Sequence, residues 1–196
     1  MSSLPSNSEI TLEITFSLSL LPVEAQVSVL NGMVVDDFNG DGNLDVAING
    51  NDFGGEVTNG RFDALNGLVL VGDGTGNFKA LNILQSGIFI PGDGKALVKL
   101  TDSKGEYLLA ASQNRGPLEV FKIKTTSLNV PLVPGDNYAL VQLQNGKTQK
   151  QEFYFGSSFL SQSASFIHIT PAVKSITVVN GKGEKRSIDL STQKKL

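Results

Sequence analysis

The sequence predicts an all-β protein with little helix, and three observations support this. Glycine is abundant, with 21 residues in a chain of 196, and it is interleaved with Val, Ile, Leu and Phe; this composition is typical of short strands joined by tight turns. Apolar residues recur at every second position in several short runs that end at turn residues, as in strands with one buried face. No stretch of 12 residues shows apolar residues at helical spacing between capping residues.

The composition also limits the kind of protein. With 40% hydrophobic and 18% charged residues, the chain can fold around a core, either as one good-sized domain or as two small ones, and extended disorder and collagen are excluded. It contains no cysteine, which excludes disulfide frameworks, zinc ribbons and thiol chemistry. Stability must therefore come from packing, hydrogen bonds or a metal without thiolate ligands.

The first expected strand spans residues 10–20, where apolar residues alternate with Thr, Glu and Ser until Pro22 ends the pattern. Because unpaired sheet edges recruit other strands, we expect this strand to cover an exposed edge within the chain or to pair with another protein. Further strands are expected at residues 32–35, 44–49, 67–71, 78–84, 96–100, 107–112 and 118–124.

A change in composition at residues 125–136 predicts a boundary between two β units, 1–124 and 125–196. This stretch has two prolines and few charges, as linkers often do. In the second unit, strands are expected at residues 138–144, 148–155, 165–170, 175–180 and 186–190, with a hairpin turn at Asn145-Gly146.

Charge is distributed unevenly along the chain. The formal net charge is −3, but residues 1–100 carry 12 acidic and 4 basic residues, whereas residues 101–196 carry 7 acidic and 12 basic ones. An acidic first half is a poor surface for nucleic acid, so no nucleic-acid partner is expected. No apolar run reaches the ~18–20 residues of a transmembrane helix, and the first residues lack the basic start of a secretory signal, so neither segment is expected in this chain.

A faint internal repeat relates two segments that lie 63 residues apart. The shift places MVVDDFNGDGNLDVAINGN over ALVKLTDSKGEYLLAASQN and aligns Gly42 with Gly105 and Ala47 with Ala110. Repeats of about 40–50 residues are typical of β-propeller blades, and the insert GGEVTNGRFDALNG lengthens the spacing here. Chance similarity of two β-hairpins is the alternative.

One motif carries a specific chemistry. In residues 37–45, side chains that bear oxygen occupy loop positions 1, 3, 5 and 9, glycine occupies position 6, and a backbone carbonyl is available at position 7. This spacing suits Ca²⁺, which takes six to eight oxygen ligands. An EF-hand is excluded, because position 12 is Ile48 and both flanks are β-like. The alternative is a metal-free turn rich in Asp, Asn and Gly, although three carboxylates in nine residues would repel one another without a cation.

The sequence resembles a known family at this motif. The segments VVDDFNGDGNLDVAINGN and GLVLVGDGTGNF resemble FG-GAP/VCBS repeats, which form β-propeller blades with a calcium loop between two strands. GKTQKQEFYFGSSFLSQSASFIHI is similar to the UnbV/ASPIC domain that ends large exported VCBS proteins of Bacteroidetes-type bacteria. The resemblance implies partial propeller-like antiparallel blades in residues 1–124 and a small sandwich-like or barrel-like unit in residues 125–196. The implied calcium ligands are Asp37, Asn39, Asp41, Asn43 and Asp45.

Two departures from the family pattern limit the inference. A propeller needs at least four blades, and about two blades' worth of sequence precedes residue 125. The repeated segment places Leu100, Asp102, Lys104 and Leu108 where four of the ligands stand, so only one calcium site is expected.

The resemblance implies a non-enzymatic, calcium-binding interaction module of an exported or cell-surface bacterial protein. Its partner would be a protein or a surface glycan, within a larger outer-membrane or extracellular assembly. The alternatives are a calcium-dependent hydrolase fragment and an accessory subunit that folds only on a larger partner. The single histidine, His168, has no nucleophile motif near it, and we expect it to be structural.

Overall fold

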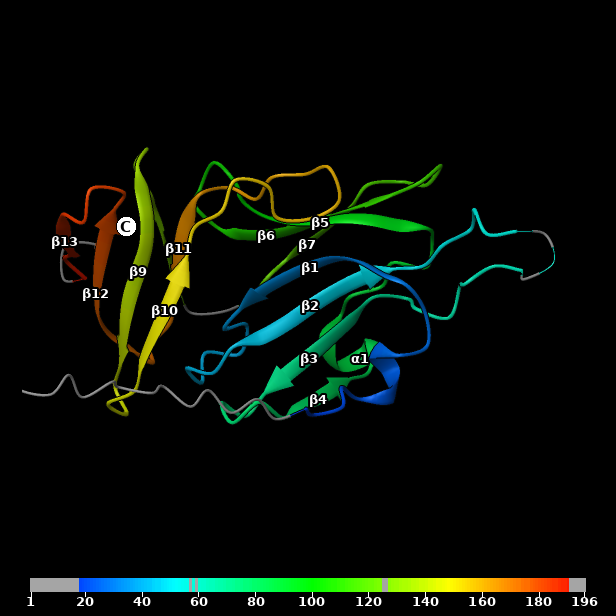
Figure 1. Ribbon diagram of the computed structural model, residues 1–196, viewed down its shortest axis with the longest axis horizontal. Helices are drawn as coiled ribbons and strands as arrows, with labels where there is room; N and C mark the ends of the chain where they lie inside the picture. The colour runs from blue at the N-terminus through cyan, green and yellow to red at the C-terminus, as the bar shows by residue number, and fades with distance from the viewer. Residues whose placement is uncertain (1–17, 57, 59, 125–126, 191–196) are drawn as a thin grey trace, which may run out of the picture.

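The computed structural model describes residues 18–56, 58, 60–124 and 127–190. This part of the chain is mostly β, as the sequence predicts, and its strands form four antiparallel sheets with almost no helix (Figure 1). The expected strand at 10–20 lies outside the described residues except for its last three, which form no strand.

The first sheet is a four-stranded meander in the order β1-β2-β3-β4. Its strands are β1 (Leu30–Asp36), β2 (Asp45–Gly50), β3 (Leu68–Gly72) and β4 (Phe78–Leu81). Val34 pairs with Ala47 across the first hairpin, and both side chains are buried, while Met33 and Val35 point to the other face. The alternation read from the sequence therefore sets which side of β1 faces the core.

The second sheet has the order β5-β6-β7, with β5 (Gly94–Thr101), β6 (Tyr107–Gln113) and β7 (Glu119–Lys122). Strands β1 and β5 lie side by side, and Asn31 Nδ2 donates a hydrogen bond of 2.8 Å to the Gly94 carbonyl between them. Gly32 allows this approach, since a Cβ there would lie 2.5 Å from Leu97 N. The two hairpins aligned by the 63-residue shift are thus neighbours in space.

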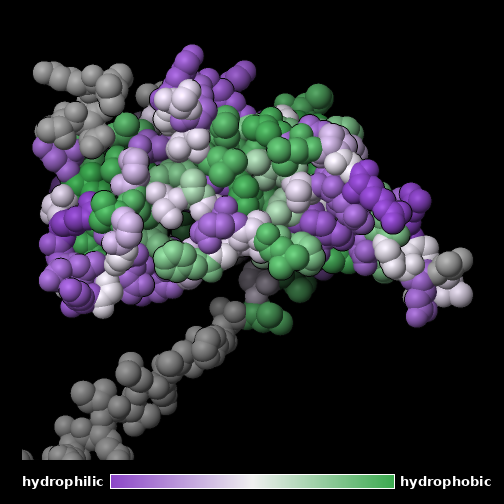
Figure 2. Space-filling view, turned by 90° about the horizontal axis from the view of Figure 1, so that it is seen from above, coloured by the Kyte–Doolittle hydropathy of each residue, from purple (hydrophilic) through white to green (hydrophobic). Residues whose placement is uncertain are grey.

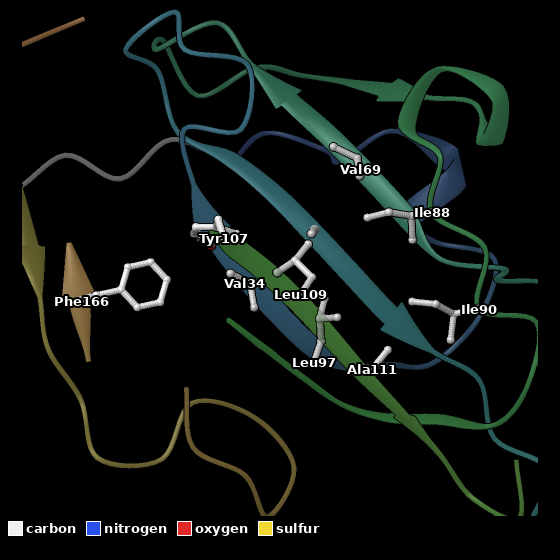
Figure 3. Close-up of a cluster of buried hydrophobic side chains, with 10 residues drawn as sticks. Val34, Val69, Ile88, Ile90, Leu97, Tyr107, Leu109, Ala111 and Phe166 are labelled. Carbon is white, nitrogen blue, oxygen red and sulfur yellow. The ribbon is translucent and has the colours of Figure 1, made fainter. Parts of the chain in front are cut away.

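A hydrophobic core fills the space between these two sheets. Figure 3 shows Val34, Leu97, Leu109 and Ala111 pointing toward one another, with Phe166 reaching in from a more distant strand. A smaller cluster packs Ala25, from the 3₁₀ turn η1 (Val23–Ala25), against the other face of the first sheet. The first sheet is therefore covered on both faces, as its largely buried strands β2 and β3 require.

The remaining strands form two sheets, β10-β9-β12-β13 and β11-β8. Their bounds are β8 (Leu128–Pro131), β9 (Asp136–Leu143), β10 (Thr148–Glu152), β11 (Phe166–Ile169), β12 (Val173–Asn180) and β13 (Lys185–Ile188). A second core lies among these strands, with Val141, Ile167 and Ile176 almost fully buried. The hairpin turn at Asn145-Gly146 is present, with Gly146 at φ 86°.

The structure differs from the expected strands at three places. The strand expected at 78–84 ends at Leu81, because Asn82 caps a helical turn, α1 (Ile83–Ser86), in a reciprocal pair of hydrogen bonds with Gln85. Strand β8 lies inside the stretch expected to be a linker and pairs with β11. Strand β10 ends at Glu152, shorter than expected.

No helix in the described ranges is long and apolar enough to cross a membrane.

Candidate metal-binding loop

The loop expected to bind calcium joins β1 to β2, and its base is formed by the paired residues Asp36 and Asp45. Asp45 is fully buried. Its Oδ2 accepts a hydrogen bond from Phe38 N at 3.0 Å and its Oδ1 accepts one from Gly72 N at 3.0 Å. A carboxylate offers about four acceptor positions, so Asp45 retains acceptor capacity beyond these two bonds.

Asp37 organises the turn itself. Its carboxylate accepts hydrogen bonds from the N–H groups of Gly40 (2.8 Å), Asp41 (3.1 Å) and Gly42 (3.0 Å). Gly40 and Gly42 have φ of 82° and 86°, a left-handed conformation that glycine adopts without a Cβ clash. The two glycines of the motif therefore allow the chain to wrap around the first carboxylate.

The other three expected ligands lie at the rim of the loop. Asn39 Oδ1 accepts from Asp41 N at 2.9 Å, and Asp41 Oδ1 accepts from Asn43 N at 2.7 Å. Four of the five expected residues lie in the turn between β1 and β2, and Asp45 is the first residue of β2. Within the described residues, no three His, Cys, Asp or Glu side chains are arranged as a metal-binding group, so a cation here would depend on the Asn oxygens as well as on the carboxylates.

The donor set suits a hard cation. Every candidate ligand presents oxygen, which is the ligand atom of Ca²⁺. Burial raises the pKa of the Asp45 carboxyl, and the nearby Asp41 and Asp37 raise it further. No ion pair from the described part of the chain reaches Asp37, Asp41 or Asp45. A bound cation would relieve this unfavourable concentration of negative charge.

The loop packs against residues that come from the end of the chain. Thr170 Oγ1 donates to Asp37 Oδ2 at 2.8 Å, and Gln149 Nε2 donates to the Gly42 carbonyl at 2.7 Å. A Cβ on Gly42 would lie 3.0 Å from the Cβ of Ala172. Sequence reasoning missed these contacts because they join positions more than 100 residues apart, and no local pattern indicates them.

A buried polar cluster adjoins the loop on the side of β5. Asp36 Oδ2 lies 3.0 Å from Lys99 Nζ and accepts a hydrogen bond of 3.2 Å from the Tyr107 hydroxyl. Burial raises the pKa of Tyr107 well above 10, and the charge of Asp36 and its hydrogen bond to Tyr107 add to the effect. The neutral phenol is therefore the form that the fold favours.

His168 lies next to this cluster and is buried. Its ring packs edge to face on Tyr107, with 4.8 Å between ring centroids. Asn129 Nδ2 donates to the Gly105 carbonyl, so Asn129 Oδ1 is the acceptor that lies 2.9 Å from His168 Nδ1. Nδ1 therefore carries the proton, and burial, the main influence on its pKa, lowers it.

Two other hairpin tips use a single aspartate in a simpler way. Asp102, in the repeated segment, accepts hydrogen bonds from Lys104 N (2.8 Å) and Glu106 N (2.9 Å). Asp73 accepts from the Thr75 hydroxyl, which is the main reason that its pKa falls to about 2. Asx turns of this kind need no metal. The 37–45 loop differs from them in its two further aspartates and in its buried Asp45.

No protein-family model matches this chain, and the curated proteins contain no match to it.

Proposed function

We propose that this protein is a calcium-stabilised, non-enzymatic interaction module of an exported or cell-surface bacterial protein. The observation that carries the proposal is the 37–45 loop, which contains the five oxygen-bearing residues expected as ligands and buries Asp45 without a countercharge from the described residues. The resemblance to FG-GAP/VCBS repeats supports the same assignment.

Calcium would supply positive charge and a fixed coordination geometry, with no part in bond making or breaking. On binding, the carboxylates of Asp37, Asp41 and Asp45 and the amide oxygen of Asn39 would have to turn toward the ion, because no three of the described acidic side chains converge without it; the backbone carbonyl of Asn43 would complete the ligand set. Weak affinity is sufficient, since extracellular calcium modules work with Kd of order 10⁻⁴ to 10⁻³ M. Because Thr170 and Gln149 hydrogen-bond to the same loop, a calcium-ordered loop also gives the C-terminal sheets a fixed surface on which to pack.

The finer architecture is part of the proposal. We assign β1–β4 and β5–β7 as two propeller-like blades, which is supported by their meander order and by the close approach of β1 and β5. The C-terminal sheets, which share one core, are assigned as a small sandwich-like unit. Two blades do not close a ring, so the module would act through its loops and sheet edges, on a protein partner or a surface glycan.

Thermal unfolding with calcium and with a chelator tests the proposal. Calcium should raise the Tm, because a ligand that binds only the native state stabilises it by mass action. Asp41→Ala should abolish this response, whereas Asp73→Ala, in a loop with a single aspartate, should preserve it. Lys104→Asp should not create a second calcium response, because the repeated loop lacks the other ligands. A Tm that is the same in calcium and in chelator would overturn the calcium assignment.

A further inference from the structure

A groove of about 540 Å³ runs between β1 and β10, which are edge strands of two different sheets. One wall carries Met33 and Val35, both about half exposed. Lys150, Gln151 and Glu152 of β10 also line the groove, together with residues of the segment after β10. Figure 2 shows that hydrophobic side chains are also exposed around the middle of the face seen from above. The volume lies in the range of ligand sites in proteins.

Among the residues that the structure describes, the backbone groups on the edge of β10 that faces away from β9 have no partner. Leu143 N donates to the Lys147 carbonyl and Phe153 N donates to the Asn137 carbonyl, which identifies the odd-numbered residues of β10 as those bonded to β9. The N–H and C=O groups of Thr148, Lys150 and Glu152 therefore point outward. Nothing in the described ranges hydrogen-bonds to them.

The edge of β5 that faces away from β6, unlike that of β10, is hydrogen-bonded to another part of the chain. Its outward backbone groups are paired with the serine-rich segment after β10. Ser163 Oγ accepts from Lys99 N at 3.2 Å, and Ala164 N donates to the Lys99 carbonyl at 2.8 Å. Ser158 Oγ likewise accepts from Leu97 N. The described part of the chain thus covers β5 and leaves β10 open beside the groove.

The side-chain chemistry of the groove favours a strand over a sugar. Ser157 Oγ donates a hydrogen bond to Ser163 Oγ, and Gln162 Nε2 donates one to the Tyr154 carbonyl. These polar side chains therefore hydrogen-bond within the protein and offer little to a sugar. Lys99 pairs with Asp36, and Lys150 pairs with Glu152, so the lining has no net charge to attract an acidic ligand. With respect to the described residues, the backbone of β10 on one side of the groove and the apolar surface on the other side remain free.

We propose that this groove binds an extended, uncharged segment of a partner protein, which adds to the free edge of β10 as a further strand. Backbone hydrogen bonds to β10 supply affinity, and apolar residues at alternate positions of the partner strand pack on Met33 and Val35. The proposal deepens the proposed interaction function by assigning the surface that makes the contact.

The test measures binding of a fluorescent probe peptide to the full chain in calcium. The probe alternates Val and Thr over eight residues between terminal Gly-Ser extensions, and its control carries N-methyl groups on the residues whose N–H would face β10. The unmodified probe should bind and the N-methylated one should bind at least tenfold more weakly. Equal binding of the two peptides, or no binding of either, would overturn the proposal.

Variants of the protein localise the contact. Lys150→Pro removes an outward N–H, which an edge strand tolerates, and it should weaken the probe at least tenfold, while Lys150→Ala should not. Lys185→Pro is the matched control, because β13 is the opposite edge strand of the same sheet. Asn180 N donates to the Glu184 carbonyl, so the backbone N–H of the next residue, Lys185, points away from β12. Unchanged binding by Lys150→Pro would overturn the assignment.

A second pair of variants does not depend on the backbone of β10. Met33→Asp should reduce probe binding. Val120 on β7 is 52% exposed, against 51% for Met33, so Val120→Asp is the matched control and should leave probe binding unchanged. If the chain itself dimerises and Lys150→Pro abolishes the dimer, the groove binds a second copy and the assignment to another protein is overturned. An intact calcium response of the Tm alongside failed probe binding would reject this groove and leave the calcium assignment standing.

Discussion

Asp36 and Lys99, which the 63-residue shift places over each other, form an ion pair with 3.0 Å between Asp36 Oδ2 and Lys99 Nζ. Asp36 lies on β1 and Lys99 on β5, so the pair joins two edge strands of different sheets that lie side by side. The Asp36 side chain is buried and also accepts a hydrogen bond from Tyr107. The two repeated segments differ at this aligned position, with Asp in one and Lys in the other, and the ion pair between these two residues links the segments.

Removing Lys99 should destabilise the fold substantially. Lys99→Met leaves the buried Asp36 carboxylate without its cation and should lower the free energy of unfolding by about 2–4 kcal/mol. The control Lys122→Met breaks a solvent-exposed pair with Glu106 and should cost less than about 1 kcal/mol. Adding Asp36→Asn to Lys99→Met should cost less than the two single effects combined. Urea denaturation of the four variants measures this, and full additivity would show that the pair does not act as a unit.

Two glycines with the same φ test the packing of the 37–45 loop. Gly42 and Gly146 both have φ of 86°, but a Cβ on Gly42 would lie 3.0 Å from Ala172, whereas a Cβ on Gly146 would meet nothing within 4 Å. Gly146→Ala should cost about 1 kcal/mol for the left-handed conformation. Gly42→Ala should cost at least about 1 kcal/mol more, because the Cβ also pushes the loop away from the C-terminal residues. Equal losses in chemical denaturation would show that this contact is not tight.

Local patterns in the sequence predict most strands and the position of the loop, because alternation and turn residues act over a few positions. Val34 and Ala47 are buried where the period of two places them, and Gly42 takes the positive φ that the motif requires. The hydroxyl of Thr170 on Asp37 joins residues 133 positions apart, and no local pattern predicts such a contact. The helical turn after Asn82 had a readable signal, the Asn and Gln of its capping pair, but the apolar run around it favoured a strand.

Ionisation of Tyr107 should make the folded state less stable in alkali. Its pKa is raised in the folded state by burial and by Asp36, while in the unfolded chain it is about 10. Above pH 10 the unfolded state therefore releases this proton first, so the free energy of unfolding falls as pH rises. Tyr107→Phe should be less stable by about 1–2 kcal/mol at neutral pH, and its stability should fall less steeply above pH 10. Parallel alkaline profiles of the two proteins would contradict the assignment.

Phe166 should contribute more to stability than any exposed aromatic residue, because it links the last strands to the first core. It lies on β11, yet it packs in the core between the first two sheets, edge to face with Tyr107 at 5.3 Å between centroids. Lys99 Nζ also lies 4.8 Å from the centre of its ring.

Phe166 is 4% exposed and Phe155 is 98% exposed, so the two residues form a matched pair. Phe166→Ala should cost about 3–5 kcal/mol, because the cavity adds to the lost burial, whereas Phe155→Ala should stay within about 0.5 kcal/mol of the parent. Since Phe166 joins the C-terminal strands to the core of the first sheets, its loss should also expose the C-terminal strands to hydrogen exchange before the rest of the molecule. If all protected amides of the variant instead exchange only through global unfolding, the sheets on either side of Phe166 unfold as one cooperative unit.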